Sequence, residues 1–523
     1  MEGKLNTLNK LYNHALTKYG NRTALIFEGK KLSYQNLKKA SNRVAHALLR
    51  HGVQANTRVA LMMENCLEFV ISDMGLVQAG GAKVPLNSML GEKEIEYILN
   101  DSGAEIVIMG ESFFGKFQNI ESNVRNVKLV VGLSTSELLP NNWMSWDEFQ
   151  GNELETDVAV HSSPTDIAGI FYTGGTTGVP KGVVHDQRNV IQNTFAHIME
   201  LEIHHDEKIL ITSPLPHSAG MVVLAGLLKG AEHWVEKGFH PQIVLNRIHE
   251  NRITFTFMVP TMIYRVMDEI KDQEYNFSSL RTIMYGAAPI TAERLKQGLN
   301  IFGRVFIQIY GQTEAPNLIT TLRKDDHRMD DNLYQRRLRS CGQPVMSSLV
   351  KIVDDNGNEV PHGTEGEILA STPYNMKFYH HKPDATEETI VQGWVHTGDV
   401  GMLDEDGYLY LLDRKKDMII SGGMNVYTTE VENLIGKHPG VQLAAVIGVP
   451  HDDWGEAVMA VIIPSKENPP TVESIHELCQ QLSSYKRPKE IKFVENIPLT
   501  PYGKIDKKAL KSQYWAAKDR GIN

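Results

Sequence analysis

Alternation of strand-like and helix-like segments in the first hundred residues is the feature that most limits the fold of this chain. Ser33 stands where it can cap a helix with apolar side chains at helical spacing, and Gly52 stands where that helix would end. The segments that follow are strands at 59–63, 83–85 and 105–109 and helices at 67–79 and 92–99. Because strands that alternate with helices pair in parallel through βαβ units, this region predicts an α/β fold with a mainly parallel sheet.

The pattern changes in the last third of the chain. Short strand-like runs occur beside the turn pairs Asn356-Gly357 and Asp406-Gly407, which is typical of antiparallel hairpins. Five consecutive charged residues follow at 413–417, and Thr429 with Glu432 resembles a capping box that opens a helix. The remaining hundred or so residues suit a compact α+β domain. We therefore expect a large domain over 1–412 and a small domain over 417–523, joined at 413–416.

The composition excludes several classes of protein. The chain has 523 residues with 53 Lys and Arg against 63 Asp and Glu, and this net charge of −10 argues against a nucleic-acid surface. Its three cysteines are far apart, so they form neither a disulfide framework nor a metal motif. The first residues lack an apolar signal core, and the longest apolar run, 220–228, is too short to span a bilayer. These features predict a cytoplasmic protein with no transmembrane segment.

The strongest local signal is a glycine-rich loop at 172–182, with the sequence YTGGTTGVPKG, which follows an apolar run at 167–171. Glycines let backbone N–H groups converge on an anion, threonine hydroxyls donate to phosphate oxygens, and Lys181 adds a positive charge. A Walker-type loop is excluded because it needs Lys between Gly and Ser or Thr, whereas Pro180 precedes and Gly182 follows Lys181. The segment predicts a different kind of phosphate-binding loop.

This loop resembles the phosphate loop of the adenylate-forming (ANL) superfamily, which comprises acyl-CoA synthetases, peptide-synthetase adenylation domains and firefly-type luciferases. Further motifs of that family follow in the expected order. They are PLPHSAG at 214–220, YGAAP at 285–289, YGQTE at 310–314, GWVHTGD at 393–399, Asp413-Arg414, SGGMN at 421–425 and PYGKI at 501–505. The likeness spans about residues 170 to 506, and the alternating N-terminal segment fits the remainder.

The resemblance implies a role for each motif. The phosphates and nucleoside of ATP would be bound by Thr173, Gly174, Gly175, Thr176, Thr177, Gly178, Lys181, Gly286, Ala287, Ala288, Tyr310, Gly311, Gln312, Thr313, Asp399 and Arg414. Within this set Tyr310 would stack on adenine and Asp399 would accept hydrogen bonds from both ribose hydroxyls. Thr176 and Glu314 would hold Mg²⁺, an ion that prefers hard oxygen ligands.

The resemblance also implies a two-step reaction. A carboxylate attacks the α-phosphorus of MgATP to give acyl-adenylate and pyrophosphate, and a thiol then attacks the adenylate. Lys504, with Thr176, Glu314 and His217, would serve the first step, and Gly422 and Gly423 would let the pantetheine arm of coenzyme A pass in the second. Between the steps the small domain would rotate as a mobile lid about Lys416.

Four functions remain open at this point. The first is an AMP-forming acid:CoA ligase, and the second is an adenylating enzyme that loads a carrier protein. The third is an oxygen-using, luciferase-like enzyme, and the last is a non-catalytic nucleotide-binding module. The presence of Glu314, Asp399, Arg414 and Lys504 disfavours the last, and the sequence leaves a homodimer open.

By resemblance, the acyl pocket would be lined by His217, Ser218, Met221, Gly286, Ile309 and Ala315. These residues include no Arg, Lys or Asp that would receive an ionic group. They predict an apolar carboxylic acid, either a medium- or long-chain fatty acid or an aromatic acid. Elsewhere we expect the histidine pairs 204–205 and 380–381, and the lysines of 507–511, to lie on the solvated surface.

Overall fold

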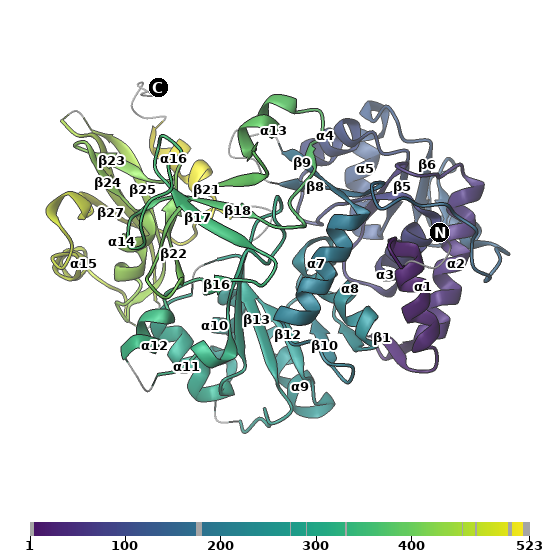
Figure 1. Cartoon of the computed structure of the whole chain (residues 1–523), viewed down its shortest axis with the longest axis horizontal. Coiled ribbons are helices and arrows are strands. Elements are labelled where there is room, and N and C mark those ends of the chain that lie inside the picture. Colours follow the sequence, from purple (N-terminus) through teal and green to yellow (C-terminus); the bar gives the residue numbers. More distant parts are fainter. Residues whose placement is uncertain are drawn as a thin grey trace.

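The computed structural model describes residues 5–173, 180–271, 273–288, 290–329, 332–451, 453–465, 468–499 and 505–515. Within these ranges the strands form four sheets, and Figure 1 shows the chain running from the N-terminal sheets to a C-terminal unit at the opposite end of the molecule. The helices are α1 (Leu8–Lys18), α2 (Tyr34–Arg50), α3 (Leu67–Ala79), α4 (Glu92–Ser102), α5 (Phe114–Ile120), α6 (Trp146–Gln150), α7 (Gln187–Glu200), α8 (Gly220–Lys229), α9 (Pro241–Asn251), α10 (Pro260–Glu269), α11 (Ala292–Phe302), α12 (Asn332–Arg337), α13 (Pro383–Thr389), α14 (Thr428–Ile435), α15 (Val472–Cys479) and α16 (Lys507–Trp515).

Two large sheets form the N-terminal part. The first has the order β19 (Phe378–Tyr379), β9 (Lys181–Asp186), β8 (Ile167–Thr173), β4 (Ala82–Pro85), β3 (Arg58–Met62), β5 (Ile106–Met109), β6 (Leu129–Gly132) and β7 (Met144–Ser145). The second has the order β16 (Gln343–Pro344), β15 (Thr320–Leu322), β14 (Phe306–Tyr310), β13 (Thr282–Gly286), β12 (Phe255–Met258), β10 (Lys208–Ile211), β11 (Glu232–Val235), β1 (Thr23–Phe27) and β2 (Lys30–Ser33). The central strands of both sheets pair in parallel, and antiparallel strands lie at the edges. The predicted α/β fold with mixed sheets is confirmed.

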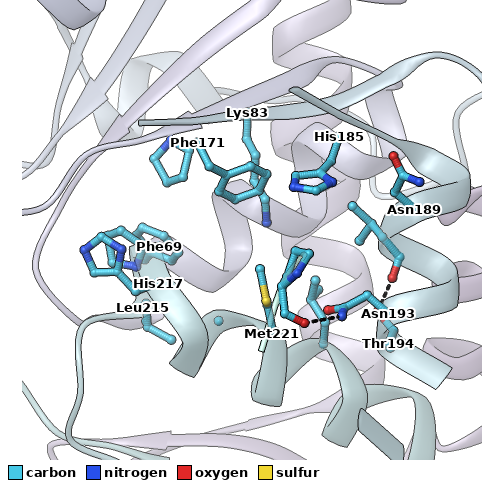
Figure 2. Close-up of a pocket in the computed structure, with 16 residues that line it drawn as sticks. Phe69, Lys83, Phe171, His185, Asn189, Asn193, Thr194, Leu215, His217 and Met221 are labelled. Atoms are coloured by element: carbon cyan, nitrogen blue, oxygen red, sulfur yellow. Dashed lines mark hydrogen bonds between the residues drawn. The ribbon is translucent and has the colours of Figure 1, made fainter. Parts of the chain in front are cut away.

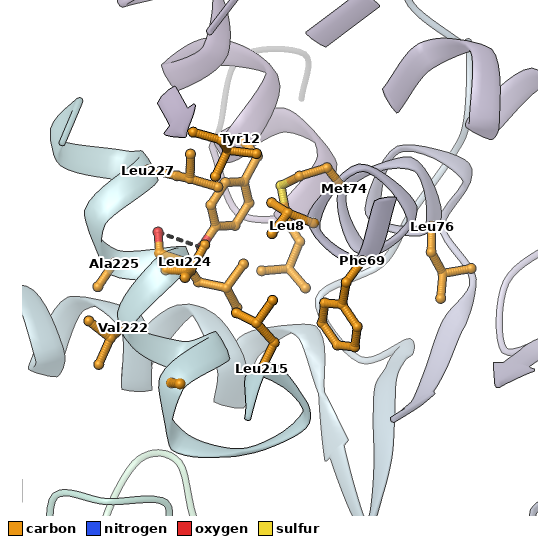
Figure 3. Packing of buried hydrophobic residues seen from close by; sticks show 14 of the residues in the cluster. Leu8, Tyr12, Phe69, Met74, Leu76, Leu215, Val222, Leu224, Ala225 and Leu227 are labelled. Carbon is orange, nitrogen blue, oxygen red and sulfur yellow. Dashed lines mark hydrogen bonds between the residues drawn. The ribbon is translucent and has the colours of Figure 1, made fainter. Parts of the chain in front are cut away.

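The main hydrophobic core lies between these two sheets. Helices α1, α2, α3, α7 and α8 fill the space, and their buried side chains pack on Leu25 and Ile209 of one sheet and on Val59 and Ile106 of the other. Figure 3 shows α1, α3 and α8 meeting around Tyr12, whose hydroxyl donates to the backbone oxygen of Leu224 across 3.1 Å. This core fixes the two sheets relative to each other, and the candidate site is built at their edges.

The C-terminal third contains the other two sheets. One has the order β17 (Leu349–Val353), β18 (Gly366–Ser371), β21 (Trp394–Leu403) and β20 (Ile390–Val391), with β22 (Leu409–Arg414) paired to β21. The other has the order β24 (Met424–Val426), β23 (Ile419–Ser421), β26 (Gly455–Pro464) and β25 (Val441–His451), with β27 (Glu490–Phe493) paired to β26. The chain passes from one sheet to the other between Arg414 and Ile419, and the predicted joint at 413–416 overlaps this passage.

The start of α14 corrects two predictions from the sequence. Thr429 does not cap the helix; Asp413 does so from the end of β22, by accepting from the Thr428 hydroxyl at 2.7 Å and from the Thr428 backbone N–H. The Glu432 carboxylate turns inward instead, to the Lys507 ammonium at 2.7 Å. Lys507 is therefore paired and mostly buried rather than solvated, because α16 packs beside α14 and β25.

The histidine pairs differ from each other. His204 and His205 are exposed, as expected, and so is His381. His380 is buried, contrary to the prediction, because it follows β19 at the edge of a large sheet. Burial and the neighbouring His381 lower the pKa of His380, so its neutral form is favoured. Within the described ranges, no helix combines the length and hydrophobicity needed to cross a bilayer.

Candidate active site

The strands on either side of the glycine-rich loop form a hairpin. Thr173 ends β8 and Lys181 begins β9, and the two residues are antiparallel partners. The chain therefore leaves β8 and enters β9 at the same end of this strand pair, and the sequence correctly predicted a strand before the glycine-rich segment. Gly174, Gly175, Thr176, Thr177 and Gly178 lie outside the described residues.

Tyr379 joins two of the predicted motifs. The Lys181 ammonium lies 4.0 Å from the centre of the Tyr379 ring, a cation–π contact. The hydroxyl of the same tyrosine donates to Oε1 of Glu314 across 2.5 Å. Burial and the Glu314 charge raise the pKa of Tyr379, so the phenol stays protonated as a donor. Sequence reasoning missed this residue, because a tyrosine in the two-residue strand β19, which pairs with β9, has no chemical signature of its own.

A second group of contacts surrounds Asp399 on β21. Oδ2 of this carboxylate accepts from the Tyr310 hydroxyl at 2.7 Å and from the Gln312 amide at 2.8 Å. Gln312 also donates to the backbone oxygen of Thr397 at 2.7 Å. Burial and the Asp399 charge raise the pKa of Tyr310. These hydrogen bonds thus connect two motifs that are about ninety residues apart in sequence. The Asp399 side chain at their centre is only 4% exposed.

Basic side chains lie beside Asp399 on the passage between the sheets. Arg414 faces Asp399 across β21 and β22, with 3.5 Å between Nε and Oδ1. Burial and the charge of Arg414 lower the pKa of Lys416, whose ammonium also interacts electrostatically with Asp399 and Lys181. Lys415 points away, to Asp355 at 3.1 Å. The predicted hinge residue Lys416 therefore sits among the same charges as the two nucleotide motifs.

The segments predicted to lie along adenine follow the carboxyl ends of β13 and β14. A side chain at Gly286 would come within 2.6 Å of the Ile309 backbone oxygen, so glycine allows the two strands to approach. Ala287 has a φ of +66° and is exposed, with Ala288 half-buried after it. A Cβ on Gly311 would meet the Asn317 backbone at 2.6 Å, which explains the glycine in YGQTE. Because β13 and β14 are parallel neighbours, both segments emerge at one edge of the sheet.

A cavity opens beside these motifs (Figure 2). Its walls come from β4, β8, β9, α3, α7 and the turn that leads into α8. The lining residues are Phe69, Lys83, Pro85, Phe171, His185, Asn189, Val190, Asn193, Thr194, Leu215, Pro216, His217, Gly220, Met221, Leu224 and Pro316. His217 lies in the irregular helical turn Leu215–Ala219 and contacts the Asn87 amide through Nε2 at 2.9 Å.

The cavity contains only some of the residues predicted to line an acyl pocket. His217 and Met221 are at its wall, whereas Ser218 is hydrogen-bonded to Asn317 at 2.8 Å. Ile309 and Ala315 are buried in packed core, and Gly286 lies against Ile309. Among the described residues, Ser218, Gly286, Ile309 and Ala315 are not part of the cavity wall.

The cavity wall carries polar groups that the sequence did not reveal. The Lys83 ammonium lies at the cavity and pairs with Asp73 at 2.9 Å. His185 contacts the backbone oxygen of Thr313 through Nε2 at 2.8 Å, and burial lowers the pKa of this imidazole to about 4. The Asn193 amide donates to the Pro316 backbone oxygen at 2.7 Å. The predicted lining residues include no Lys, whereas Lys83 lines this cavity. The sequence gives no sign of which face a lysine in a short strand occupies.

Gly422 and Gly423 form the tight turn between β23 and β24. Their φ values are +60° and +79°, and two consecutive positive angles are typical of a type I′ hairpin turn. Both residues are exposed, with the Gly422 backbone N–H donating to the Trp454 oxygen at 2.9 Å. Backbone geometry therefore favours glycine here, independently of a role in binding coenzyme A. Lys504 lies outside the described residues.

The described residues contain no cluster of three or more His, Cys, Asp or Glu side chains that would form a protein-only metal site. Glu314 is a half-buried carboxylate with one oxygen held by Tyr379. A single carboxylate combined with substrate phosphates is a usual Mg²⁺ environment. The donor set at Glu314 therefore fits a magnesium ion that arrives with a nucleotide.

Comparison with known proteins agrees with this arrangement. The family model of the AMP-binding enzyme matches residues 12–380, and that of the AMP-binding enzyme C-terminal domain matches residues 430–504. The medium/long-chain-fatty-acid–CoA ligase FadD8 of Mycobacterium tuberculosis is 33% identical, over 97% of this chain and 90% of its own. The fatty acid–[acyl-carrier-protein] ligase ScoC of Streptomyces coeruleorubidus is 32% identical, over 96% of this chain and 95% of its own.

Among solved structures, the anthranilate CoA ligase AuaEII in complex with anthranoyl-AMP superimposes with a TM-score of 0.89 at 26% identity, over 98% of each chain. The family model of the AMP-binding enzyme covers more than half of this chain, and the two relatives are more than 30% identical over nearly all of it. The chain belongs to the AMP-binding enzyme family.

Proposed function

We propose that this chain is an AMP-forming carboxylic acid:CoA ligase. It activates an acid with an apolar body, of the medium- or long-chain fatty or aromatic class, as acyl-adenylate and then transfers the acyl group to coenzyme A. The observation that carries the proposal is that both ends of the segment 310–314 are held by other motifs. Glu314 is joined to Lys181 through Tyr379, and Tyr310 and Gln312 donate to Asp399. This arrangement supports a nucleotide site built from these motifs.

The first half-reaction is an in-line attack of a carboxylate oxygen on the α-phosphorus of ATP, with loss of pyrophosphate. Both partners are anionic, so positioning and electrostatic stabilisation supply most of the catalysis. Lys181 and the glycine-rich loop bind phosphate oxygens, Asp399 holds the ribose, and Arg414 keeps Asp399 oriented. Lys504 bridges the incoming carboxylate and the α-phosphate. Glu314 and Thr176 would hold a magnesium ion, which would supply positive charge to the phosphates.

The second half-reaction transfers the acyl group to a thiol. We assign residues 1–412 to an adenylating domain, 413–416 to a hinge and 417–523 to a lid. Rotation about Lys416 withdraws Lys504 and brings the Gly422-Gly423 turn to the acyl-adenylate. The position of Lys416 on the passage between two sheets, from Arg414 to Ile419, supports this assignment.

A carrier-protein thiol is the alternative acceptor. The relative ScoC is named as a fatty acid–[acyl-carrier-protein] ligase, which favours this candidate. One experiment separates the two: AMP and pyrophosphate release is measured over a panel of carboxylic acids, without acceptor, with coenzyme A and with a phosphopantetheinylated carrier protein. The proposal expects acid-dependent release that coenzyme A accelerates with stoichiometric thioester. Acceleration by the carrier protein alone would favour the alternative.

A further inference from the structure

Lys83 reaches the cavity through a gap that a glycine leaves in the sheet. Lys83 on β4 is the parallel partner of Gly169 on β8, and a Cβ on Gly169 would lie 3.0 Å from Lys83 Cγ. Gly169 does not have a positive φ angle, so its backbone conformation does not require glycine. The missing side chain instead provides the space along which the Lys83 stem passes. Figure 2 shows the amine of Lys83 pointing into the cavity between Phe171 and His185.

The Lys83 ammonium keeps hydrogen-bonding capacity. Its Nζ lies 3.0 and 2.9 Å from the two oxygens of Asp73 on α3, and the two side chains are 14% and 7% exposed. An ammonium has three N–H donors, of which one carboxylate uses no more than two here. No other acceptor within hydrogen-bond distance of Nζ is found among the residues that the structure describes. The third donor is therefore available to a molecule in the cavity.

Lys83 lines a part of the cavity wall that is set back from the glycine-rich loop. Its strand partner Gly169 lies four residues before Thr173, where the glycine-rich loop begins, which is about 13 Å along the strand. A second cavity extends on its other side towards α1, and the two cavities share Lys83, Val190 and Leu224 in their walls. Between His217 and these shared residues, the wall of the first cavity is mainly apolar, with Phe69, Phe171, Leu215 and Met221.

We propose that the acid bound here carries a neutral hydrogen-bond acceptor at the end of its apolar body distal to the carboxylate. This acceptor is a hydroxyl, ether or keto oxygen, and the Lys83 ammonium donates a hydrogen bond to it. This inference rests on the proposed function, because it places the reacting carboxylate at the nucleotide motifs. A neutral oxygen suits the site better than a second carboxylate, since Asp73 already balances the Lys83 charge and would repel another anion.

The test measures binding by calorimetry without ATP, so that it does not depend on turnover. The first set of probes compares the affinity for unbranched acids, from hexanoate to hexadecanoate, with the affinity for their ω-hydroxy and ω-carboxy counterparts. The second set compares 4-methylcinnamate with 4-hydroxycinnamate. For at least one pair, the wild-type protein should bind the hydroxy acid about tenfold more tightly. In the double variant Lys83→Met/Asp73→Asn, which leaves no unpaired buried charge, this ratio should fall to about one. The double variant Lys237→Met/Glu28→Gln removes an exposed ion pair and is the matched control.

Two outcomes would overturn the proposal: preference for the unsubstituted acid in every pair, or a hydroxy-acid preference that persists in the double variant. The single variant Asp73→Asn gives a second test, because it leaves the charge of the Lys83 ammonium unbalanced. Its affinity for the ω-carboxy acids should rise about tenfold. An unchanged affinity would contradict the role of Asp73. Binding with the expected selectivity but no acid-dependent AMP release would refute the proposed function and leave the Lys83 assignment standing.

Discussion

The Tyr379 hydroxyl donates to the Glu314 carboxylate across 2.5 Å, while the ring of the same tyrosine lies 4.0 Å from the Lys181 ammonium. One side chain on a short edge strand thus contacts both the residue that would bind magnesium and the lysine that follows the glycine-rich loop. The edge strand β19 is held by β9, which begins at Lys181. Tyr379 therefore acts as a positioning residue for two parts of the nucleotide site.

Replacing Tyr379 with Phe keeps the ring beside Lys181 and removes the hydrogen bond to Glu314. A hydrogen bond to a charged group contributes about 1.5–3 kcal/mol, so we expect roughly a ten- to hundredfold loss of adenylation rate. The Mg²⁺ concentration for half-maximal rate should rise as well. Tyr374→Phe, which removes a buried hydroxyl bonded to the Leu318 backbone oxygen, is the control. An unchanged magnesium dependence would argue against a role in holding Glu314.

Replacing Asp399 with Asn removes the charge that Tyr310, Gln312 and Arg414 surround. A neutral amide is a weaker acceptor for two ribose hydroxyls, so the KM for ATP should rise at least tenfold, with a smaller effect on the KM for the acid. Asp355→Asn, at an exposed partner of Lys415, should leave both unchanged. Steady-state kinetics with varied ATP concentration measure this KM, and an unaltered KM for ATP would rule out a role of Asp399 in binding the ribose.

Replacing Lys504 with Ala should slow adenylate formation at least a hundredfold, because the lysine neutralises charge only in the first transition state. Thioester formation from supplied acyl-adenylate and coenzyme A should change less than threefold. Lys508→Ala, on the following helix, is the control. Single-turnover measurements of the two half-reactions check this, and equal losses in both would contradict the assignment.

The Gly422-Gly423 turn needs a variant that preserves its backbone. Gly423→Asn does so, since Asn tolerates positive φ and no atom lies within 4 Å of the added Cβ. We expect pyrophosphate release within twofold of wild type and about a tenfold fall in thioester formation. Gly407→Asn places the same residue at φ +78° in a turn between β21 and β22 and should affect neither. Normal thioester formation by Gly423→Asn would exclude this turn from the path of the thiol.

Buried histidines make the stability of the fold sensitive to acid. Burial lowers the pKa of His197 and of His327 to about 4, from an ordinary value near 6.5. Since the unfolded chain binds the extra protons, these groups stabilise the fold fully above pH 6.5 and lose that contribution as the pH falls towards 4. Each contributes up to about 1.4 kcal/mol per pH unit in this window. Denaturant unfolding of wild type and His327→Gln from pH 7 to 4.5 should show a shallower slope for the variant.

Local patterns predicted most of the elements well. The expected helix at 67–79 coincides with α3, and Ser33 does cap α2 by accepting from the Asn36 backbone N–H at 3.1 Å. Apolar periodicity and capping chemistry are encoded within a few residues, so they can be read directly. The capping box at Thr429 failed because the actual cap, Asp413, is distant in sequence and reaches α14 through tertiary structure.

The candidate site was predictable only in part for the same reason. Glycine spacing and motif order identify Lys181, Glu314 and Asp399 without a structure. The role of Tyr379 depends on its partner Glu314, which is more than sixty residues away in sequence. The role of Lys83 depends on the packing of β4 beside β8. No local pattern distinguishes a lysine that faces a cavity from one that faces solvent.

Transfer of a carboxylate oxygen to AMP distinguishes attack on the α-phosphorus from other routes to a thioester. With the acid labelled by ¹⁸O in both carboxylate oxygens, attack on the α-phosphorus places one labelled oxygen in AMP as thioester accumulates. The account predicts one ¹⁸O per AMP, in equal amount to the thioester formed with coenzyme A. AMP that carries no label, or thioester that forms without AMP, would contradict it.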